Sequence, residues 1–122
     1  MKRKAPESHL QAACISWWHL QYGNHNPNWR LFKVHNEGRK SIQSAVSDKK
    51  LGLMAGVFDT FLAVTRPDCP GVFIEFKAPG RKLSQPQVQF MASACSQGYE
   101  CWVIHFFDEF TAAINDYMKG IK

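Results

Sequence analysis

Apolar residues recur at helical spacing near the start of the chain, directly after Pro6. Intervals of three and four residues separate Leu10, Ala13, Cys14, Trp17 and Trp18. This spacing places side chains on one face of an α-helix, and proline is favoured in a first helical turn. We therefore predict an amphipathic helix that begins near Pro6 and ends before the polar segment 23–28.

Two further helices are predicted in the second half of the chain. Ser84 suits an N-cap, Pro86 suits the first turn behind it, and Gly98 suits the end of the helix. The apolar stripe of this helix comprises Val88, Met91, Ala92 and Cys95. The last helix is indicated by a stripe made of Phe110, Ala113, Ile114, Tyr117 and Met118.

Runs of β-branched and aromatic residues between the helices predict strands. One covers 31–35, and two more cover 57–64 and 72–76 with a tight connection between them. The run 99–106 is almost continuously apolar, which favours a strand buried on both faces. Segment 39–53 is polar and basic with little periodicity, and we predict a mobile loop or a poorly defined helix. The order of helix, three strands, helix, strand and helix predicts an α/β fold.

Composition changes this picture little but adds a candidate partner. A chain of 122 residues, 45% hydrophobic and 20% charged, without a composition break, suits a single domain over 1–122. The formal charge of +5 and the pI near 9.2 suit an anionic partner, with nucleic acid first. Solubility alone also accounts for a charge of this size.

Several kinds of site and location are disfavoured by the sequence. The cysteines form no C-x-x-C pair, and no histidine has a metal-site spacing, so we expect reduced structural thiols and neither a zinc site nor a redox motif. No stretch approaches the roughly 20 apolar residues of a membrane span. The N-terminus lacks the apolar run of a signal peptide, and a soluble cytoplasmic protein is expected.

Two carboxylates stand inside predicted strands, where an unpaired charge is costly. Asp59 lies in one strand and Glu75 in the next, followed by Phe76 and Lys77. Removing a lone carboxylate from water costs on the order of several kcal/mol, so such groups are usually paired, placed at a strand end or bound to a cation. Side chains alternate along a strand, so Glu75 and Lys77 share one face, and Asp59 can join them if the strands pair.

This combination suits metal-assisted hydrolysis of a phosphodiester bond. Carboxylates hold hard divalent cations through oxygen, and a lysine can orient water or stabilise developing charge. Asp59 and Glu75 would be direct ligands of Mg²⁺ or Mn²⁺, the Phe76 carbonyl a third protein ligand, and Lys77 the cationic group. The competing interpretation is an edge-strand salt bridge between Glu75 and Lys77, because a spaced D…E-x-K pattern also occurs by chance.

Three motifs follow one another along the chain, namely Gly56-Val57-Phe58-Asp59, Ile74-Glu75-Phe76-Lys77 and Leu83-Ser84-Gln85-Pro86-Gln87. In this order they resemble the signature of the VRR-NUC family of the PD-(D/E)XK nuclease superfamily. Glu7 with Leu10 and Gln11 resembles the family's first-helix motif, and Asn36-Glu37-Gly38-Arg39 resembles its turn after the first strand. Phe58 departs from the proline more often seen before the aspartate, but it contributes no ligand atom. The resemblance spans almost the whole chain and implies a restriction-endonuclease-like core, a mixed central sheet flanked by helices.

The resemblance also implies roles for five site residues. Asp59, Glu75 and Lys77 would be the catalytic core, Gln87 would line the site from the following helix, and Glu7 would add an acidic group. Apart from the resemblance, Glu7 would be a solvated first-turn carboxylate favoured by the helix dipole. Gln87 would likewise satisfy local backbone groups at the start of its helix.

The candidate DNA contacts are basic and polar residues that flank the acidic site. They are His35, Asn36, Arg39, Lys40, Lys49, Lys50, Arg81 and Lys82. Contacts of this kind bind phosphate without regard to base sequence. The tryptophans, Trp17, Trp18, Trp29 and Trp102, could stack on bases, but packing in a core or an interface is favoured at their positions.

The predicted function is a metal-dependent endonuclease that cuts DNA, with a preference for branched structures such as Holliday junctions. Stand-alone members of the resembled family look like viral or bacterial resolvases, so we expect a bacterial cell or a phage-infected host and a homodimer with two sites for paired cuts. No membrane and no organic cofactor are expected. The alternatives are a DNA-binding subunit that does not cut and a restriction-like or RNA nuclease, because such a metal centre recognises only phosphate chemistry.

Overall fold

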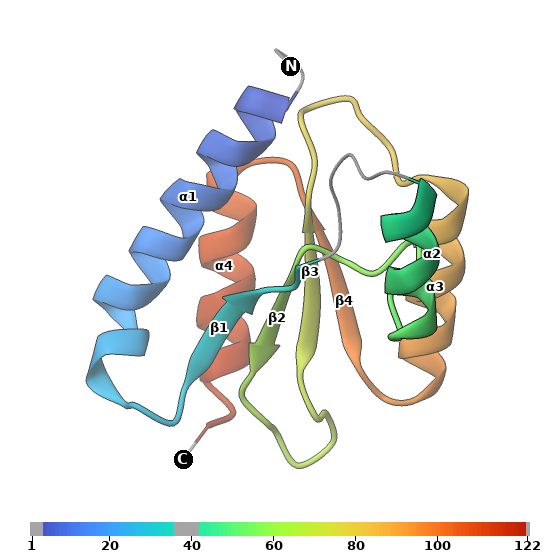
Figure 1. The fold of residues 1–122 in the computed structure, drawn as a ribbon. Helices are drawn as coiled ribbons and strands as arrows, with labels where there is room; N and C mark the ends of the chain where they lie inside the picture. Colours follow the sequence, from blue (N-terminus) through green and yellow to red (C-terminus); the bar gives the residue numbers. More distant parts are fainter. Residues whose placement is uncertain (1–3, 36–41, 122) are drawn as a thin grey trace.

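A four-stranded mixed sheet forms the centre of the computed structural model, which describes residues 4–35 and 42–121 (Figure 1). Its strands lie in the order β1 (Arg30–Lys33), β2 (Thr60–Ala63), β3 (Val72–Phe76) and β4 (Glu100–Ile104). Neighbours are antiparallel except for β3 and β4, which run parallel because a helix carries the chain back between them. The predicted α/β class and mixed sheet are confirmed.

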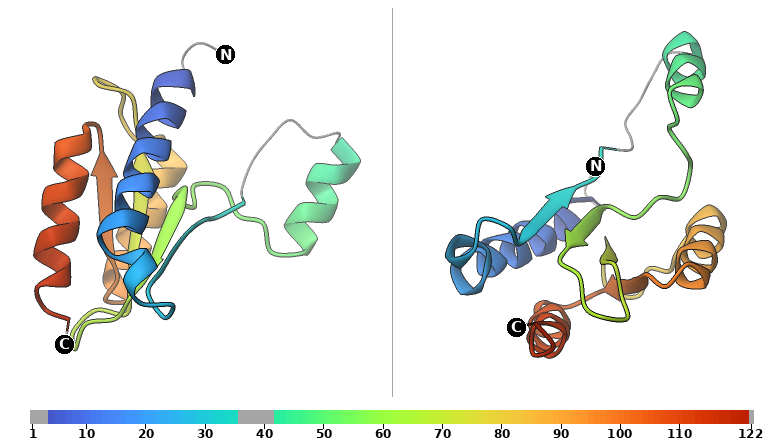
Figure 2. Two further views of the ribbon diagram at one scale, coloured as in Figure 1. Left: turned by 90° about the vertical axis from the view of Figure 1, so that its left-hand side faces the viewer. Right: turned by 90° about the horizontal axis from the view of Figure 1, so that it is seen from below.

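Helices cover both faces of this sheet. α1 (Lys4–Gln21) and α4 (Phe107–Met118) lie on one face, and α3 (Gln85–Ser96) lies on the other (Figure 1). One short turn, η1 (Gly23–His25), follows α1 where the polar segment was predicted to end the helix. α2 (Ile42–Lys50) stands away from the sheet in both views of Figure 2, and the right-hand view shows it on the α3 side.

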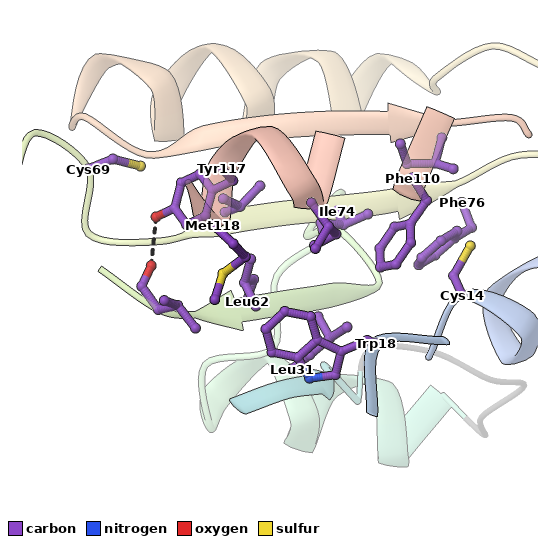
Figure 3. Packing of buried hydrophobic residues seen from close by; sticks show 14 residues of the cluster. Cys14, Trp18, Leu31, Leu62, Cys69, Ile74, Phe76, Phe110, Tyr117 and Met118 are labelled. Carbon is purple, nitrogen blue, oxygen red and sulfur yellow. Dashed lines mark hydrogen bonds between the residues drawn. The ribbon is translucent and has the colours of Figure 1, made fainter. Parts of the chain in front are cut away.

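The main core fills the space between the sheet and the pair α1 and α4. Trp18, Phe76 and Phe110 are among its fully buried side chains (Figure 3). Each large apolar side chain removed from water contributes roughly 1.5–3 kcal/mol to folding. The hydroxyl of Tyr117 also lies in this layer. Its Oη donates a hydrogen bond to the carbonyl of Val64 at 2.6 Å, drawn as a dashed line in Figure 3. The even-numbered residues of β3 point into this core. Because side chains alternate along a strand, its odd-numbered residues point to the opposite face of the sheet.

An aromatic layer occupies that opposite face, beneath α3. The ring of Phe73 lies 4.6 Å from that of Phe61 and 4.9 Å from that of Phe90, measured between centroids. Phe90 also contacts Phe58, the buried residue before Asp59. These contacts hold α3 against the strand that carries Glu75.

Three strand predictions need correction. β2 begins at Thr60, so Asp59 lies directly before the strand and not inside it. β1 and β4 are likewise shorter than predicted, and Glu100 at the start of β4 is exposed, so the prediction of a strand buried on both faces is wrong. The reason is that β4 is the last strand of the described sheet, where flanking helices cover side chains only in part.

The predicted apolar stripe of α3 is also wrong in part. Val88 and Cys95 are exposed, whereas Ala94 is buried and Phe90 is half-buried. The helix is rotated from the predicted setting because Phe90 packs into the aromatic layer while Gln87 faces the carboxylates. The polar residue thus helps to determine which face of α3 meets the sheet.

For segment 39–53 the sequence predicted either a mobile loop or a poorly defined helix. Residues 42–50 form the helix α2, and 39–41 lie outside the described residues. Val46 is 50% exposed and Leu51, just after the helix, is 84% exposed. Tertiary packing of an apolar face supplies most of a short helix's stability in proteins, and Val46 contributes little to such packing. Its weak periodicity in the sequence matches this position outside the core.

The tryptophans and cysteines mostly serve packing, as predicted. Trp18 is fully buried and the other three tryptophans are half-buried against the core, so Trp18 cannot supply an exposed dimer contact. All four cysteines are free, with Cys14 and Cys69 buried and Cys95 exposed. Within the described ranges, none of the helices has both the length and the apolar character of a membrane span.

Candidate active site

Antiparallel pairing of β2 and β3 brings the two predicted carboxylates together. Thr60 is opposite Ile74, so the residue that precedes β2 lies beside the residue that follows Ile74. Asp59 and Glu75 therefore meet at the point where β2 begins and β3 approaches its end. The start of α3 covers the same point, because Gln87 bonds to Glu75.

Glu75 is the most constrained of the site carboxylates, with only 3% of its surface exposed. Its Oε1 accepts from the backbone N–H of Asp59 at 3.0 Å, and its Oε2 accepts from Nε2 of Gln87 at 2.8 Å. Lys77 Nζ lies 3.7 Å from Oε2, which is a loose ion pair. β3 is an internal strand, so the edge-strand salt bridge considered from the sequence is not the arrangement present.

The carboxyl group of Asp59 is half-buried and within hydrogen-bonding reach of the Glu75 carboxyl and of the Phe76 backbone N–H. Burial raises the pKa of Asp59, an effect opposed by those two hydrogen bonds and by the charge of Lys77. Burial and the adjacent Asp59 raise the pKa of Glu75 from 4.5 to about 8. The two groups thus compete to hold negative charge in a space that excludes water.

α3 begins with hydrogen bonds that direct Gln87 into the site. The side chain of Ser84 accepts from the Gln87 backbone N–H at 3.3 Å, and the Gln87 Oε1 accepts from the Ser84 backbone N–H at 2.8 Å. This capping box leaves Nε2 of Gln87 free to donate to Glu75. Gln87 therefore satisfies local backbone groups at the start of α3 and also contacts the Glu75 carboxylate.

Gly56 allows the segment before Asp59 to pass close to the start of α3. Its φ is +89°, and a Cβ added there would lie 2.3 Å from the backbone oxygen of Pro86. Both the torsion and the close contact exclude larger residues. The glycine of the first motif thus sets how near Asp59 lies to the helix that carries Gln87.

Glu7 lies in α1 and contacts the backbone just after the end of β3. Its Oε2 accepts from the backbone N–H of Ala78 at 3.1 Å, just beyond Lys77. The charge of Glu7 is one of the causes that raise the pKa of Asp59. A half-buried carboxylate with a backbone partner far along the chain is more than a solvated first-turn residue.

The donor atoms present fit a hard divalent cation bound by few protein ligands. No three acidic, cysteine or histidine side chains gather into a metal-binding group anywhere in 4–35 and 42–121. Asp59 and Glu75 nevertheless adjoin, and both have pKa values raised by burial, which a cation between them would reverse. In a strand the N–H and C=O of one residue point to the same side, so the Phe76 carbonyl is directed toward Asp59 as its N–H is. Mg²⁺ retains several waters and commonly uses one or two carboxylates.

The predicted DNA contacts divide into those that the structure describes and those that it does not. His35, Lys49, Lys50, Arg81 and Lys82 are exposed. Asn36, Arg39 and Lys40 lie outside the described residues. Arg81 and Lys82 follow β3 and precede α3, and Lys49 and Lys50 are the last two residues of α2. α2 lies on the α3 side of the sheet in the right-hand view of Figure 2.

The structure adds two site features that no sequence pattern indicated. They are the backbone N–H of Ala78, which holds Glu7, and the close approach at Gly56. A capping box has a sequence signal, since Ser84 and Gln87 stand three residues apart with Pro86 between them. The Ala78 contact has none, because it depends on where α1 lies.

A mixed sheet with two carboxylates and a lysine at one end, flanked by helices, defines a restriction-endonuclease-like class of protein. The family model of the VRR-NUC domain matches residues 5–107. A solved structure described as a VRR_NUC domain protein aligns with a TM-score of 0.71, at 22% identity, over 93% of this chain and 88% of that chain. A search of the curated proteins finds no match. The chain belongs to the VRR-NUC domain family, and this membership implies a nuclease of the PD-(D/E)XK type.

Proposed function

We propose that the protein hydrolyses phosphodiester bonds in DNA with Mg²⁺ or Mn²⁺ held by Asp59, Glu75 and the Phe76 carbonyl. The observation that carries this proposal is the adjacency of two carboxyl groups with little access to water, since Glu75 is 3% exposed and accepts from the Asp59 backbone N–H at 3.0 Å. Burial raises the pKa of both groups. Two acids placed together in a folded core destabilise it unless they bind something positive. Lys77 offsets this only in part, since its Nζ is 3.7 Å from Glu75.

Each remaining site residue has a role that follows from its contacts. A bound cation would polarise the scissile phosphate and lower the pKa of an attacking water. Lys77 stabilises the negative charge that develops on the phosphoryl oxygens. Gln87 holds Oε2 of Glu75, which fixes the direction of that carboxylate, and Glu7 orders the backbone after Lys77 through Ala78. Asp59, Glu75 and Lys77 act at the reacting atoms, whereas Gln87 and Glu7 are positioning residues.

Exposed basic residues in α2 and in the loop between β3 and α3 support docking of a polyanion. Lys49 and Lys50 end α2, and Arg81 and Lys82 lie in the loop between β3 and α3. Such residues neutralise phosphates and release counterions, which gives affinity without base sequence preference. His35, Asn36, Arg39 and Lys40 are proposed to extend this surface. The protein acts on branched DNA as a homodimer, because paired cuts across a junction need two sites related by a twofold axis.

The experiment is a gel assay on linear, flapped and four-way-junction DNA, with matched RNA substrates. Reactions contain Mg²⁺, Mn²⁺, Ca²⁺ or EDTA. We expect cleavage of DNA in Mg²⁺ and Mn²⁺, binding without efficient turnover in Ca²⁺ and no cleavage in EDTA. Binding without cleavage under every condition would instead favour a DNA-binding subunit, and stronger cleavage of RNA would reassign the substrate.

A further inference from the structure

A cavity lies at the opposite end of β2 from the carboxylates. Its volume is about 620 Å³, and Trp29, Arg66 and Gly120 are among the residues that line it. Ala63, the last residue of β2, lies on its wall, and a strand rises about 3.4 Å per residue. Asp59 is therefore roughly 13 Å away along the strand. None of the described residues that line this cavity is acidic.

Arg66 is held rigidly at this cavity. Its guanidinium carbon lies 5.2 Å from the centroid of the Tyr117 ring, on which the charge is stabilised by a cation–π contact. A Cβ on Gly120 would lie 3.0 Å from Nε of Arg66, so the backbone there packs directly against the guanidinium. The backbone of Arg66 is fixed as well, through two hydrogen bonds with Cys69.

Among the described residues, no carboxylate forms an ion pair with the guanidinium of Arg66. Its Nε is shielded from water and has no hydrogen-bond acceptor in that part of the chain. The charge of the Glu100 carboxylate is felt by Tyr117, but this carboxylate accepts a hydrogen bond from Nε1 of Trp102 at 2.9 Å. Buried donors without acceptors are rare in folded proteins, and a bound water or ion is one explanation for such a donor.

We propose that this cavity binds the phosphate group of a nucleotide, either free or at the end of a nucleic acid strand. A guanidinium presents paired N–H donors whose geometry matches phosphate oxygens. Trp29 offers an indole beside the same space for a base, and the Asn28 amide can both donate to and accept from a base edge. The volume falls within the range of about 300–1,000 Å³ that is typical of small-molecule sites.

The test is calorimetric titration with dAMP, inorganic phosphate, and a short oligonucleotide with or without a 5′-phosphate. All titrations are done in EDTA, for the wild-type protein and Asp59→Asn, so that failure of the proposed nuclease would leave this result unaffected. We expect equal binding of dAMP by both proteins and at least tenfold weaker binding by Arg66→Gln. Arg30→Gln, which removes an exposed arginine next to Trp29, should leave dAMP binding unchanged. Comparison of the phosphorylated and unphosphorylated oligonucleotides separates a strand end from a free nucleotide.

Chemical-shift mapping on the wild-type protein makes the test independent of how the variants fold. The indole N–H of Trp29 and the amide of Gly120 should shift on addition of dAMP, while the amide of Glu75 should not. Arg66→Lys keeps the charge and removes the paired donors, and it should bind at least several-fold more weakly. No binding, equally weakened binding by Arg66→Gln and Arg30→Gln, or shifts centred on Glu75 would each overturn the proposal.

Discussion

At the scale of single residues, Glu75 is the most constrained carboxylate of the candidate site. Both of its oxygens are used, one by the Asp59 backbone and one by Gln87, so its position is set before any cation arrives. Such prior positioning reduces the entropy that cation binding would otherwise cost. The carboxylate is costly in this place without a cation because it is nearly inaccessible to water and adjoins Asp59.

This cost predicts how the stability of the cation-free protein depends on pH. The pKa of Glu75 is raised to about 8, so the folded state binds more protons than the unfolded state between pH 4.5 and 8. The stabilisation from the protonated form is therefore complete below pH 4.5 and lost as pH rises through about 8. Urea unfolding in EDTA should show stability falling over this window, and Glu75→Gln should flatten the fall.

Asp68→Asn, at an exposed carboxylate, is the matched control and should keep the wild-type slope. Addition of Mn²⁺ should restore stability at pH 8 in the wild-type protein but not in Glu75→Gln. A pH-independent stability in EDTA would show that the two carboxyl groups are not destabilised as the contacts imply.

At the scale of elements, the approach of the Gly56 segment to α3 is the most demanding contact. Gly56→Ala would place a methyl group 2.3 Å from the Pro86 oxygen in addition to the strain of φ +89°. Gly80 has a similar φ of +82° with nothing near its added Cβ, so Gly80→Ala carries the torsional strain alone. We expect Gly80→Ala to cost about 1–2 kcal/mol of unfolding free energy and Gly56→Ala clearly more.

The comparison also has a functional side, because Gly56 sets the position of Asp59 relative to Gln87. Cleavage by the folded Gly56→Ala protein should fall by at least tenfold, while Gly80→Ala cleaves normally. Equal unfolding free energies for the two variants would mean that the segment relaxes away from α3 at little cost.

α2 gives a second prediction at this scale, concerning DNA affinity. Replacing Lys49 and Lys50 with glutamine should weaken binding of all sequences and lower the slope of log K against log salt by about one unit for each phosphate no longer neutralised. The paired replacement of Arg39 and Lys40 should act in the same way. Lys119→Gln, after α4, is the control, and fluorescence anisotropy over a salt series is the measurement. An unchanged slope would remove these residues from the interface.

The elements also show what could be predicted from the sequence. The Ser84 cap, the main helices and the pairing that joins Asp59 to Glu75 all have local signals, and the three motifs identify the family. The setting of α3 was mispredicted because hydrophobic spacing ignores the bond from Gln87 to Glu75, a contact between distant residues. The bond from Ala78 to Glu7 joins residues 71 positions apart, and no local pattern encodes it.

At the scale of the whole molecule, the oligomeric state is the main prediction. One chain of this size carries one carboxylate pair, and symmetric cuts require two. Light scattering at micromolar concentration should give the mass of a dimer, about twice 13.9 kDa. A four-way junction should be cut faster than a linear duplex of the same length. A monomer that cuts both equally would leave the nuclease in place and discard the resolvase-like preference.

The exposed apolar residues of the fold show where a dimer contact could be sought. Trp18 is unavailable because it is buried, whereas Leu20, Leu51 and Met54 are 69%, 84% and 61% exposed. Leu20 lies near the end of α1, and the other two lie just after α2. Their replacement by serine, one at a time, would test each position against the measured mass.

The most direct test of the central claim compares wild-type protein, Asp59→Asn and Asp68→Asn in cleavage of one radiolabelled four-way junction. The wild-type protein and Asp68→Asn should cleave in Mg²⁺ or Mn²⁺ and stop when EDTA is added. Asp59→Asn should bind the junction with unchanged affinity in Ca²⁺ and cleave it about a thousandfold more slowly or not at all. Cleavage by Asp59→Asn at the wild-type rate, or full wild-type activity in EDTA, would contradict the assignment of this site as a metal-dependent nuclease.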